Sequence, residues 1–341
     1  MARADTSGRG DRVLEQTRAL LALDPRSPAT ARRLGRRRGE ILLLVDLLAA
    51  QEHVEEACEL GLLLEQALEQ LGEPVGAPTP TAAPGGRFRI TEHLLGIARA
   101  AGHLFYEGEV LLRQAELWAE QGDREQAASL YAQVQALAQS GDLGLLNLAA
   151  LAGLAGLAQD EGNVFKAHLL YTKQREQAAA LGEPFLEAQA LGNLSATALA
   201  MGDFRRGARY ARERLQLCAK LRDEHGQAEA LCSLGLAQRN LGDLAGSRHS
   251  YREALRLALR LGSPTLEATV CYNFGCLLVE AEPEQAAALL EHATRLAQQG
   301  GAALLVESSV RVTAQLAERL PPEVLGAARR QAARRVRALL E

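Results

Sequence analysis

The feature that most constrains the fold is a repeat with a period of 40 residues. A glycine followed by Asp or Asn recurs four times at this spacing, at Gly122-Asp123, Gly162-Asn163, Gly202-Asp203 and Gly242-Asp243. Glycine tolerates the left-handed backbone conformation that follows a helix end, and Asp or Asn can accept the free amides of a new first turn. Each pair therefore predicts a tight turn between two helices, and the period is typical of a stacked helical-repeat protein.

Large and small residues recur in the same register on both sides of these turns. Upstream, a large-x-x-large-small pattern occurs at residues 151–155, 191–195, 231–235 and 271–275, with weaker copies at 111–115 and 311–315. Five residues after each glycine stands a small residue: Ala127, Ala167, Gly207 and Ser247. The large residues supply the apolar stripe that each helix must bury, and the small residues indicate where two helices approach closely.

This pattern resembles the tetratricopeptide repeat family, in the forty-residue form found in spindle-orientation scaffolds and kinesin light chains. The resemblance covers roughly residues 107–341. It implies an all-α fold, a right-handed superhelical solenoid of antiparallel helix pairs. One helix pair cannot bury both of its faces, so neighbouring pairs are expected to stack. The composition agrees, because only 4% of the residues are aromatic and Ala and Leu supply most of the apolar content.

Three regions are expected along the chain. Residues 1–71 read as an N-terminal helical region that could hold a divergent repeat, residues 72–88 as a Pro/Gly-rich loop or linker, and residues 89–341 as the repeat array. A helix over 54–71 could close a divergent repeat that starts near Ile41. It could equally be the first helix of a unit completed by Ile90–Ala101, and the sequence leaves both pairings open.

The other end of the array should be covered by a final helix. Residues 322–341 read as the second helix of the sixth unit, with Leu325, Ala328, Ala332, Val336 and Leu339 on one side. We expect this side to cover the preceding helix, Ala303–Leu320. Arg330, Arg334 and Arg337 lie on the opposite side and should face solvent.

Composition and charge argue against a nucleic-acid-binding, a disulfide-bonded or a membrane-spanning protein. The formal net charge of −4 offers no general electrostatic case for nucleic acid. The arginines between Arg32 and Arg38 are interpreted as a solvated helix face, although they could contact an acidic partner or nucleic acid. Five cysteines with no Cys-x-x-Cys pair indicate reduced, packed thiols in a cytoplasmic protein. The most apolar run, Ile41–Ala50, is too short for a membrane span.

Catalytic chemistry is not indicated. No nucleotide-binding glycine motif is present, the seven histidines form no His-x-x-x-His pair, and no acid, base and nucleophile can be assembled. His53, beside Glu55 and Glu56, is interpreted as a helix start rather than as a metal ligand. We therefore expect no catalytic residues, no metal and no cofactor, and we do not expect an enzyme.

The resemblance implies that the first helices line a concave groove that binds a partner. One row carried over by position comprises Arg113, Gly153, Asn193, Ser233, Asn273 and Thr313, and the neighbouring row includes Gly192 and Tyr272. In related arrays, an asparagine just before the Leu-small pair holds the backbone of an extended peptide. Asn193-Leu194-Ser195 and Asn273-Phe274-Gly275 match that pattern, and a carboxamide can donate and accept at once. The alternative is an asparagine that bonds its own helix or water.

The candidate peptide-binding residues are therefore Asn193, Asn273, Arg239, Asn240, Tyr272 and Arg113. Arg239 and Asn240 would add a charged contact at the far end of a first helix. Small apolar residues dominate the rows, which favours an apolar peptide or helix over a C-terminal carboxylate. The expected function is a protein- or peptide-binding scaffold, and the alternative is a regulatory sensor module. The expected partner is a protein, extended peptide or helix, with neither nucleic acid nor membrane.

Overall fold

The computed structural model describes residues 6–73 and 86–340. Within these residues the chain forms helices and no strand, and none of the helices is long and apolar enough to cross a membrane. The helices are α1 (Thr6–Leu21), α2 (Pro28–Arg36), α3 (Arg38–Ala50), α4 (Val54–Gln70), α5 (Arg87–Ala100), α6 (Leu104–Glu120), α7 (Arg124–Gly141), α8 (Gly144–Asp160), α9 (Val164–Leu181), α10 (Pro184–Ala200), α11 (Phe204–Leu221), α12 (Glu224–Asn240), α13 (Leu244–Leu261), α14 (Pro264–Leu278), α15 (Pro283–Gln299), α16 (Ala303–Ala317) and α17 (Pro322–Ala338).

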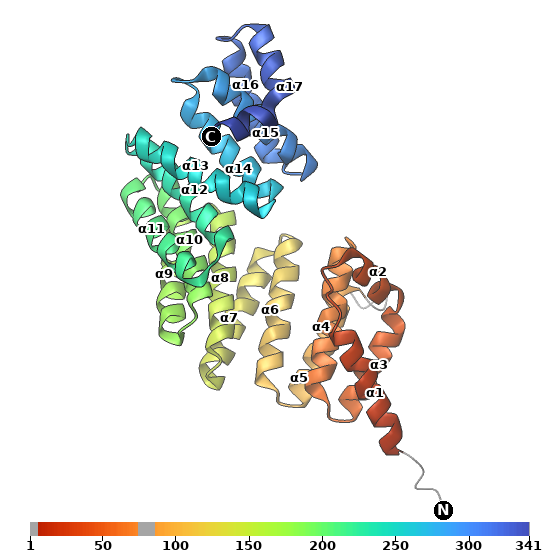
Figure 1. Cartoon of the computed structure of the whole chain (residues 1–341). Helices are drawn as coiled ribbons and strands as arrows, with labels where there is room; N and C mark the ends of the chain where they lie inside the picture. Colours follow the sequence, from red (N-terminus) through yellow and green to blue (C-terminus); the bar gives the residue numbers. More distant parts are fainter. Residues whose placement is uncertain (1–5, 74–85, 341) are drawn as a thin grey trace, which may run out of the picture. The chain divides into compact units, whose positions relative to one another are not determined.

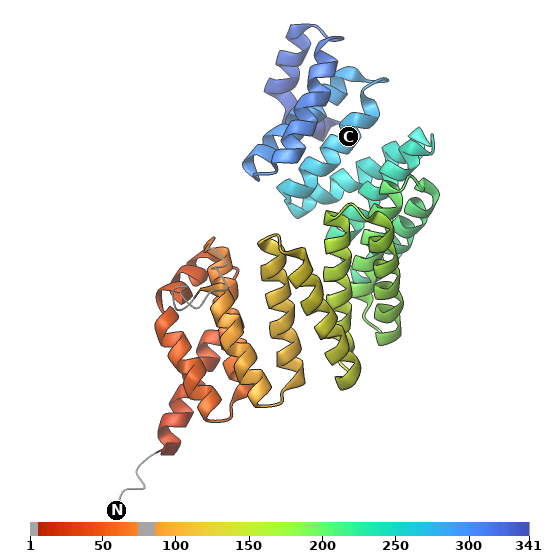
Figure 2. The same cartoon turned by 180° about the vertical axis from the view of Figure 1, so that it is seen from behind.

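The chain divides into two compact units, Met1–Glu161 with α1–α8 and Gly162–Glu341 with α9–α17. Within each unit, most helices that are consecutive in the chain lie side by side and run antiparallel, as Figure 1 and Figure 2 show. Each helix buries its apolar stripe against its neighbours along the stack. The predicted all-α solenoid of antiparallel helix pairs is therefore confirmed.

The four predicted turns are present. Gly122, Gly162, Gly202 and Gly242 have φ angles of 85°, 74°, 76° and 83°. In each case the following Asp or Asn accepts a hydrogen bond from the backbone N–H three residues later, at 3.0, 3.1, 3.0 and 2.9 Å. The glycine ends one helix, and the Asp or Asn after it accepts a hydrogen bond from a free backbone amide in the first turn of the next helix.

The turns that connect one helix pair to the next also recur every 40 residues, even where the turn residue is not glycine. Gly182 and Gly262 have φ angles of 71° and 61°. Arg222, which lies midway between them in the sequence, has a φ angle of 58°. Arg222 therefore takes the place that glycine has in the neighbouring turns. Asp223 accepts a hydrogen bond from the Gly226 N–H at 2.9 Å and starts α12 in register, so stacking overrides the preference of arginine for negative φ.

The small residues of the repeat mark close helix contacts. Ser195 Oγ donates to the Gly207 carbonyl at 3.0 Å, and Ser247 Oγ donates to the Gly235 carbonyl at 2.8 Å. A Cβ on Gly235 would lie 2.8 Å from the Tyr251 ring, which is fully buried. These positions need small side chains because the paired backbones leave no room for larger ones.

At the N-terminal end, the two pairings left open by the sequence do not exclude each other, since α4 packs against both α3 and α5. Helix α5 begins at Arg87, so the last two residues of the loop expected over 72–88 are helical. Arg87 is 4% exposed and donates from Nε to Glu65 at 2.7 Å, so the first residue of α5 is anchored to α4. The core of the expected loop, residues 74–85, lies outside the described residues.

The final helix packs differently from the expectation. Helix α17 lies against α15, and the prediction that it covers α16 is wrong. A run of small residues on α15, Ala286 to Ala288, allows this close approach, and Ala328, Ala332 and Val336 are buried. Arg330, Arg334 and Arg337 are exposed, as expected. Helix α16 keeps only Ser309 and Leu316 buried.

Candidate functional site

Each repeat consists of a first and a second helix. A groove of about 590 Å³ in the second unit crosses the first helices of three consecutive repeats. Its walls come from α10, α12 and α14, and Arg214 reaches it from the second helix α11. Its lining combines small or uncharged residues, such as Ala196, Ser233 and Thr269, with larger and charged side chains. A main chain can approach the groove closely where the small residues line it.

The structure brings the predicted row of polar residues together in this groove. Asn193, Ser233 and Asn273 all line it, each half-buried and each one repeat from the next. Asn273 Nδ2 donates to Cys232 Sγ at 3.4 Å, which leaves the carbonyl of that side chain available. Within the described part of the chain, the Asn193 carboxamide has no hydrogen-bond partner, so both its donor and its acceptor are available.

Three other candidate residues do not line the groove. Asn240 Nδ2 donates to the Leu236 carbonyl of its own helix at 2.9 Å. Tyr272 is half-buried, and burial raises the pKa of its phenol, with a further contribution from Cys276. Arg239 is exposed on the last turn of α12. The same residue type can therefore bond its own helix or face a groove, depending on its place in the repeat.

Arg113 lies in the first unit and is occupied by carboxylates. It donates to Glu65 at 3.0 Å and to Glu69 at 2.7 Å, and Glu116 lies 2.6 Å away. Burial alone would lower the pKa of Arg113, but the bonds and charges of Glu65 and Glu116 more than offset this and raise it. Glu65 is fully buried, so Arg113 acts as a cross-link between α4 and α6.

A charged group in the groove was not predicted. Arg214 Nη2 donates to Glu229 Oε2 at 2.6 Å, and His225 Nδ1 lies 3.7 Å from the same oxygen. All three residues line the groove. The signal that could have revealed Arg214 is its register, because the equivalent second-helix positions hold Val134, Gln174, Ala254 and Thr294.

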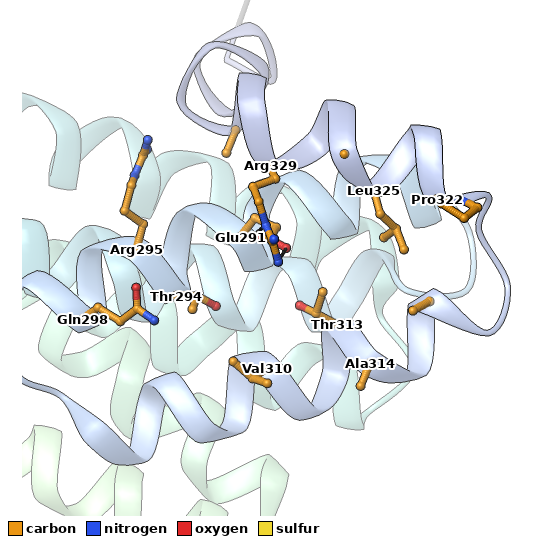
Figure 3. Close-up of a pocket in the computed structure, with 13 residues that line it drawn as sticks. Glu291, Thr294, Arg295, Gln298, Val310, Thr313, Ala314, Pro322, Leu325 and Arg329 are labelled. Carbon is orange, nitrogen blue, oxygen red and sulfur yellow. Dashed lines mark hydrogen bonds and ion pairs between the residues drawn. The ribbon is translucent and has the colours of Figure 1, made fainter.

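A second hollow, of about 730 Å³, lies between α15, α16 and α17 (Figure 3). Val310 and Ala314 on α16 and Leu325 on α17 contribute apolar walls. The Thr294 and Thr313 hydroxyls donate to carbonyls of their own helices at 2.8 and 2.9 Å, so they are already satisfied. The hollow is a consequence of packing, because α17 docks on α15 and leaves a gap beside α16.

The cysteines are packed, as the sequence suggested. Cys58, Cys218, Cys232 and Cys271 are buried, Cys276 is half-buried, and all five are unpaired. Burial, with a contribution from Glu59, raises the pKa of Cys58 to about 11. Among the described residues, no group of three or more His, Cys, Asp or Glu side chains is placed to hold a metal ion.

Comparisons with known proteins show resemblance at the level of structure. No protein-family model matches the sequence, and no curated protein sequence matches it either. BtubC (BKLC) from P. vanneervenii is 21% identical with a TM-score of 0.52, and the match covers 69% of this chain and 91% of that one. The Rap conjugation gene regulator of the plasmid pLS20, solved with a Phr peptide, is 14% identical with a TM-score of 0.55, over 87% of this chain and 85% of that one.

A third similar structure is the Signal Transduction ATPase with Numerous Domains protein from Pyrococcus horikoshii, which has a tetratricopeptide repeat sensor. It is 13% identical with a TM-score of 0.50, and the match covers 97% of this chain and 56% of that one. At these identities the likeness concerns the fold. Together with the 40-residue register, the φ angles of the turns and the stacked helix pairs, it shows that the chain has the tetratricopeptide-type repeat fold.

Proposed function

We propose that the chain is a protein- or peptide-binding scaffold that holds an extended peptide in the groove along α10, α12 and α14. The observation that carries the proposal is the row of Asn193, Ser233 and Asn273, which repeats every 40 residues and lines one groove. The Asn193 carboxamide lacks a partner in the described part of the chain. The proposal includes no catalysis.

The chemistry of the row suits a peptide backbone. A carboxamide can accept from a peptide N–H and donate to a peptide carbonyl at the same time. Because Ala196 and Ser233 are small, a main chain can come within hydrogen-bond distance of these groups. The structural likeness to a Rap regulator that was solved with a Phr peptide provides a precedent for peptide binding on this fold.

The decisive experiment is a double substitution in the row. A peptide selected from a display library against the immobilised full chain would serve as the probe, with its Kd measured by fluorescence anisotropy. Replacing both Asn193 and Asn273 with Ala should weaken binding by roughly 1 to 3 kcal/mol, because buried peptide groups lose their partners. Helicity and melting temperature should stay unchanged.

Asn240→Ala is the matched control, since that side chain bonds its own helix outside the groove. It should leave the Kd at the wild-type value. Unchanged affinity of the double variant would contradict the proposal and assign the asparagines a structural role.

A regulatory sensor module is the second candidate, favoured by the likeness to the Pyrococcus horikoshii protein that has a tetratricopeptide repeat sensor, a match that covers 97% of this chain. A sensor must change conformation when its ligand binds, whereas a scaffold need not. Small-angle X-ray scattering of the chain with and without the selected peptide separates the two. A change in radius of gyration supports the sensor, and an unchanged value supports the scaffold.

A further inference from the structure

We infer that the groove prefers peptides with an acidic side chain, and that Arg214 is the residue that recognises this carboxylate. The inference deepens the proposed peptide-binding function and rests on it. The inference starts from Arg214, a charged residue of the groove at a position where the other repeats have uncharged residues.

Arg214 departs from the pattern of its own register. The equivalent positions Val134, Gln174 and Ala254 are buried residues that pack between helices. Arg214 comes from the same kind of position on α11, yet its side chain extends to the groove and is 15% exposed. A guanidinium at a packing position carries a desolvation cost that the uncharged residues of the other repeats avoid.

Gly192 provides the space for this guanidinium. A Cβ built on Gly192 would lie 2.8 Å from Arg214 Nη1, 2.9 Å from Cζ and 3.2 Å from Nε. The guanidinium therefore occupies the space that a side chain at position 192 would fill. The neighbouring repeats hold Ala152 and Cys232 at this register position, and both carry a Cβ. Gly192 and Arg214 therefore both differ from the residues at the equivalent positions of the neighbouring repeats, and the small Gly192 makes room for the large Arg214.

The guanidinium has unused hydrogen-bonding capacity. Of the five N–H donors of an arginine, Nη2 donates to Glu229, and the Cys218 thiol beside the guanidinium is a weak acceptor. Nε is buried without a hydrogen-bond partner in the described residues. A planar guanidinium can pair with carboxylates along more than one edge. Arg214 can therefore keep its hydrogen bond to Glu229 and donate a further one from its Nη atoms to a ligand oxygen.

The balance of charges favours an acid over a base as this ligand group. The Glu229 carboxylate already accepts a hydrogen bond from Arg214 and lies near His225, so a lysine would compete with a resident cation for it. Glu229 is 41% exposed, and water can solvate its remaining oxygen at little cost. The 15% exposed guanidinium gains more from a new partner, because charge pairing strengthens away from water.

The position of Arg214 also places the acidic residue along the peptide. Gly192 directly precedes Asn193, so Arg214 lies at the Asn193 end of the row. An extended peptide advances about 3.3 Å per residue. The acidic side chain should therefore fall within one or two residues of the peptide group that Asn193 binds.

Two substitutions copied from the neighbouring repeat test the inference. Arg214→Gln reproduces Gln174, and Glu229→Gln reproduces Gln189, each in the same register. The probes are three pools of ten-residue peptides in which one central residue is Asp, Asn or Lys and the others are random. Binding of each pool to the immobilised full chain is measured at fixed peptide concentration, and peptides retained from each pool are sequenced.

The wild type should retain the Asp pool over the Asn pool by at least about tenfold, as expected for a hydrogen bond to a charged group. Arg214→Gln should remove this preference, and Glu229→Gln should preserve or increase it. Gly192→Ala, which displaces the guanidinium, provides an independent variant with the same expected loss. Circular dichroism confirms that each variant is folded.

Preference for the Lys pool, or an Asp preference that survives Arg214→Gln and Gly192→Ala, overturns the inference. If all three pools bind equally and the Asn193/Asn273 double variant weakens them alike, peptide binding stands and acidic selectivity fails. If no pool binds the wild type, the proposed function and this inference both fail.

Discussion

Carboxylates in the first unit differ in how well their charge is balanced. Glu65 is fully buried and accepts hydrogen bonds from both Arg87 and Arg113. Glu109, half-buried on α6, is in a different position, since burial and the charge of Glu116 raise its pKa. Folding therefore favours the protonated form of Glu109, and its charge at neutral pH opposes folding.

Glu109→Gln should stabilise the protein at pH 7. The folded-state pKa of Glu109 lies above the ordinary value of 4.5, so its contribution to stability is fully present below that value and is lost as pH rises through the raised pKa. Glutamine does not ionise, so the difference between variant and wild type should shrink as pH falls toward 4.5. Urea unfolding of both proteins across this range measures the difference.

Glu107→Gln on the same helix is the control. Glu107 accepts a hydrogen bond from Arg99 at 2.8 Å, so its replacement should not stabilise the protein. A Glu109→Gln variant that is less stable than wild type at pH 7 would show that the charge of Glu109 is compensated.

At the scale of elements, the turns show how stacking imposes a backbone conformation on unfavourable residues. Asp142 and Arg222 have φ angles of 53° and 58° at the positions where Gly182 and Gly262 serve the neighbouring repeats. A non-glycine residue in the left-handed region is strained, Asp less than most. Contacts between neighbouring helices hold these turns in register despite the local cost.

Arg222→Gly should therefore stabilise the protein. Relief of left-handed strain exceeds the extra entropy that glycine loses, so we expect a gain of about 0.5 to 1 kcal/mol. The reciprocal change, Gly262→Arg, should destabilise by a similar amount. Chemical denaturation with both variants provides the measurement, and a loss of stability in Arg222→Gly would mean that the arginine side chain makes a contact of greater value.

The periodicity of the sequence predicted helices and turns well because both depend on local pattern. It gives no glycine signal for the turn at Arg222, where only the neighbouring repeats specify the conformation. It also could not assign a partner to α17, since an apolar stripe identifies the buried face and not the helix that covers it. For the groove, register placed Asn193 and Asn273 together, but it could not show that Asn240 bonds its own helix.

At the scale of the whole molecule, stability depends on contacts between neighbouring helices. Helix α17 buries Ala328, Ala332 and Val336 against α15, and Arg256 donates to the Leu340 carbonyl at 3.2 Å. In a stacked array, removal of one helix exposes the apolar face of the helix that it covered.

Deletion of residues 321–341 should therefore lower the melting temperature and promote aggregation. Differential scanning calorimetry and light scattering measure the two effects. A variant with Arg330, Arg334 and Arg337 changed to Gln is the control, because these side chains are exposed and it should melt like the wild type. A truncated chain with unchanged melting would show that α17 contributes no stability.

The docking of α17 on α15 has a consequence for synthesis of the chain. Helix α15 ends at Gln299, and its cover is complete only when the ribosome has passed Leu340. At about 5 to 20 residues per second, this interval lasts roughly 2 to 8 seconds. Until α17 has left the ribosome and docked, α15 lacks this cover, and an uncovered apolar helix face is the kind of surface that chaperones bind. Slow codons between α15 and α17 would lengthen the delay before α15 is covered.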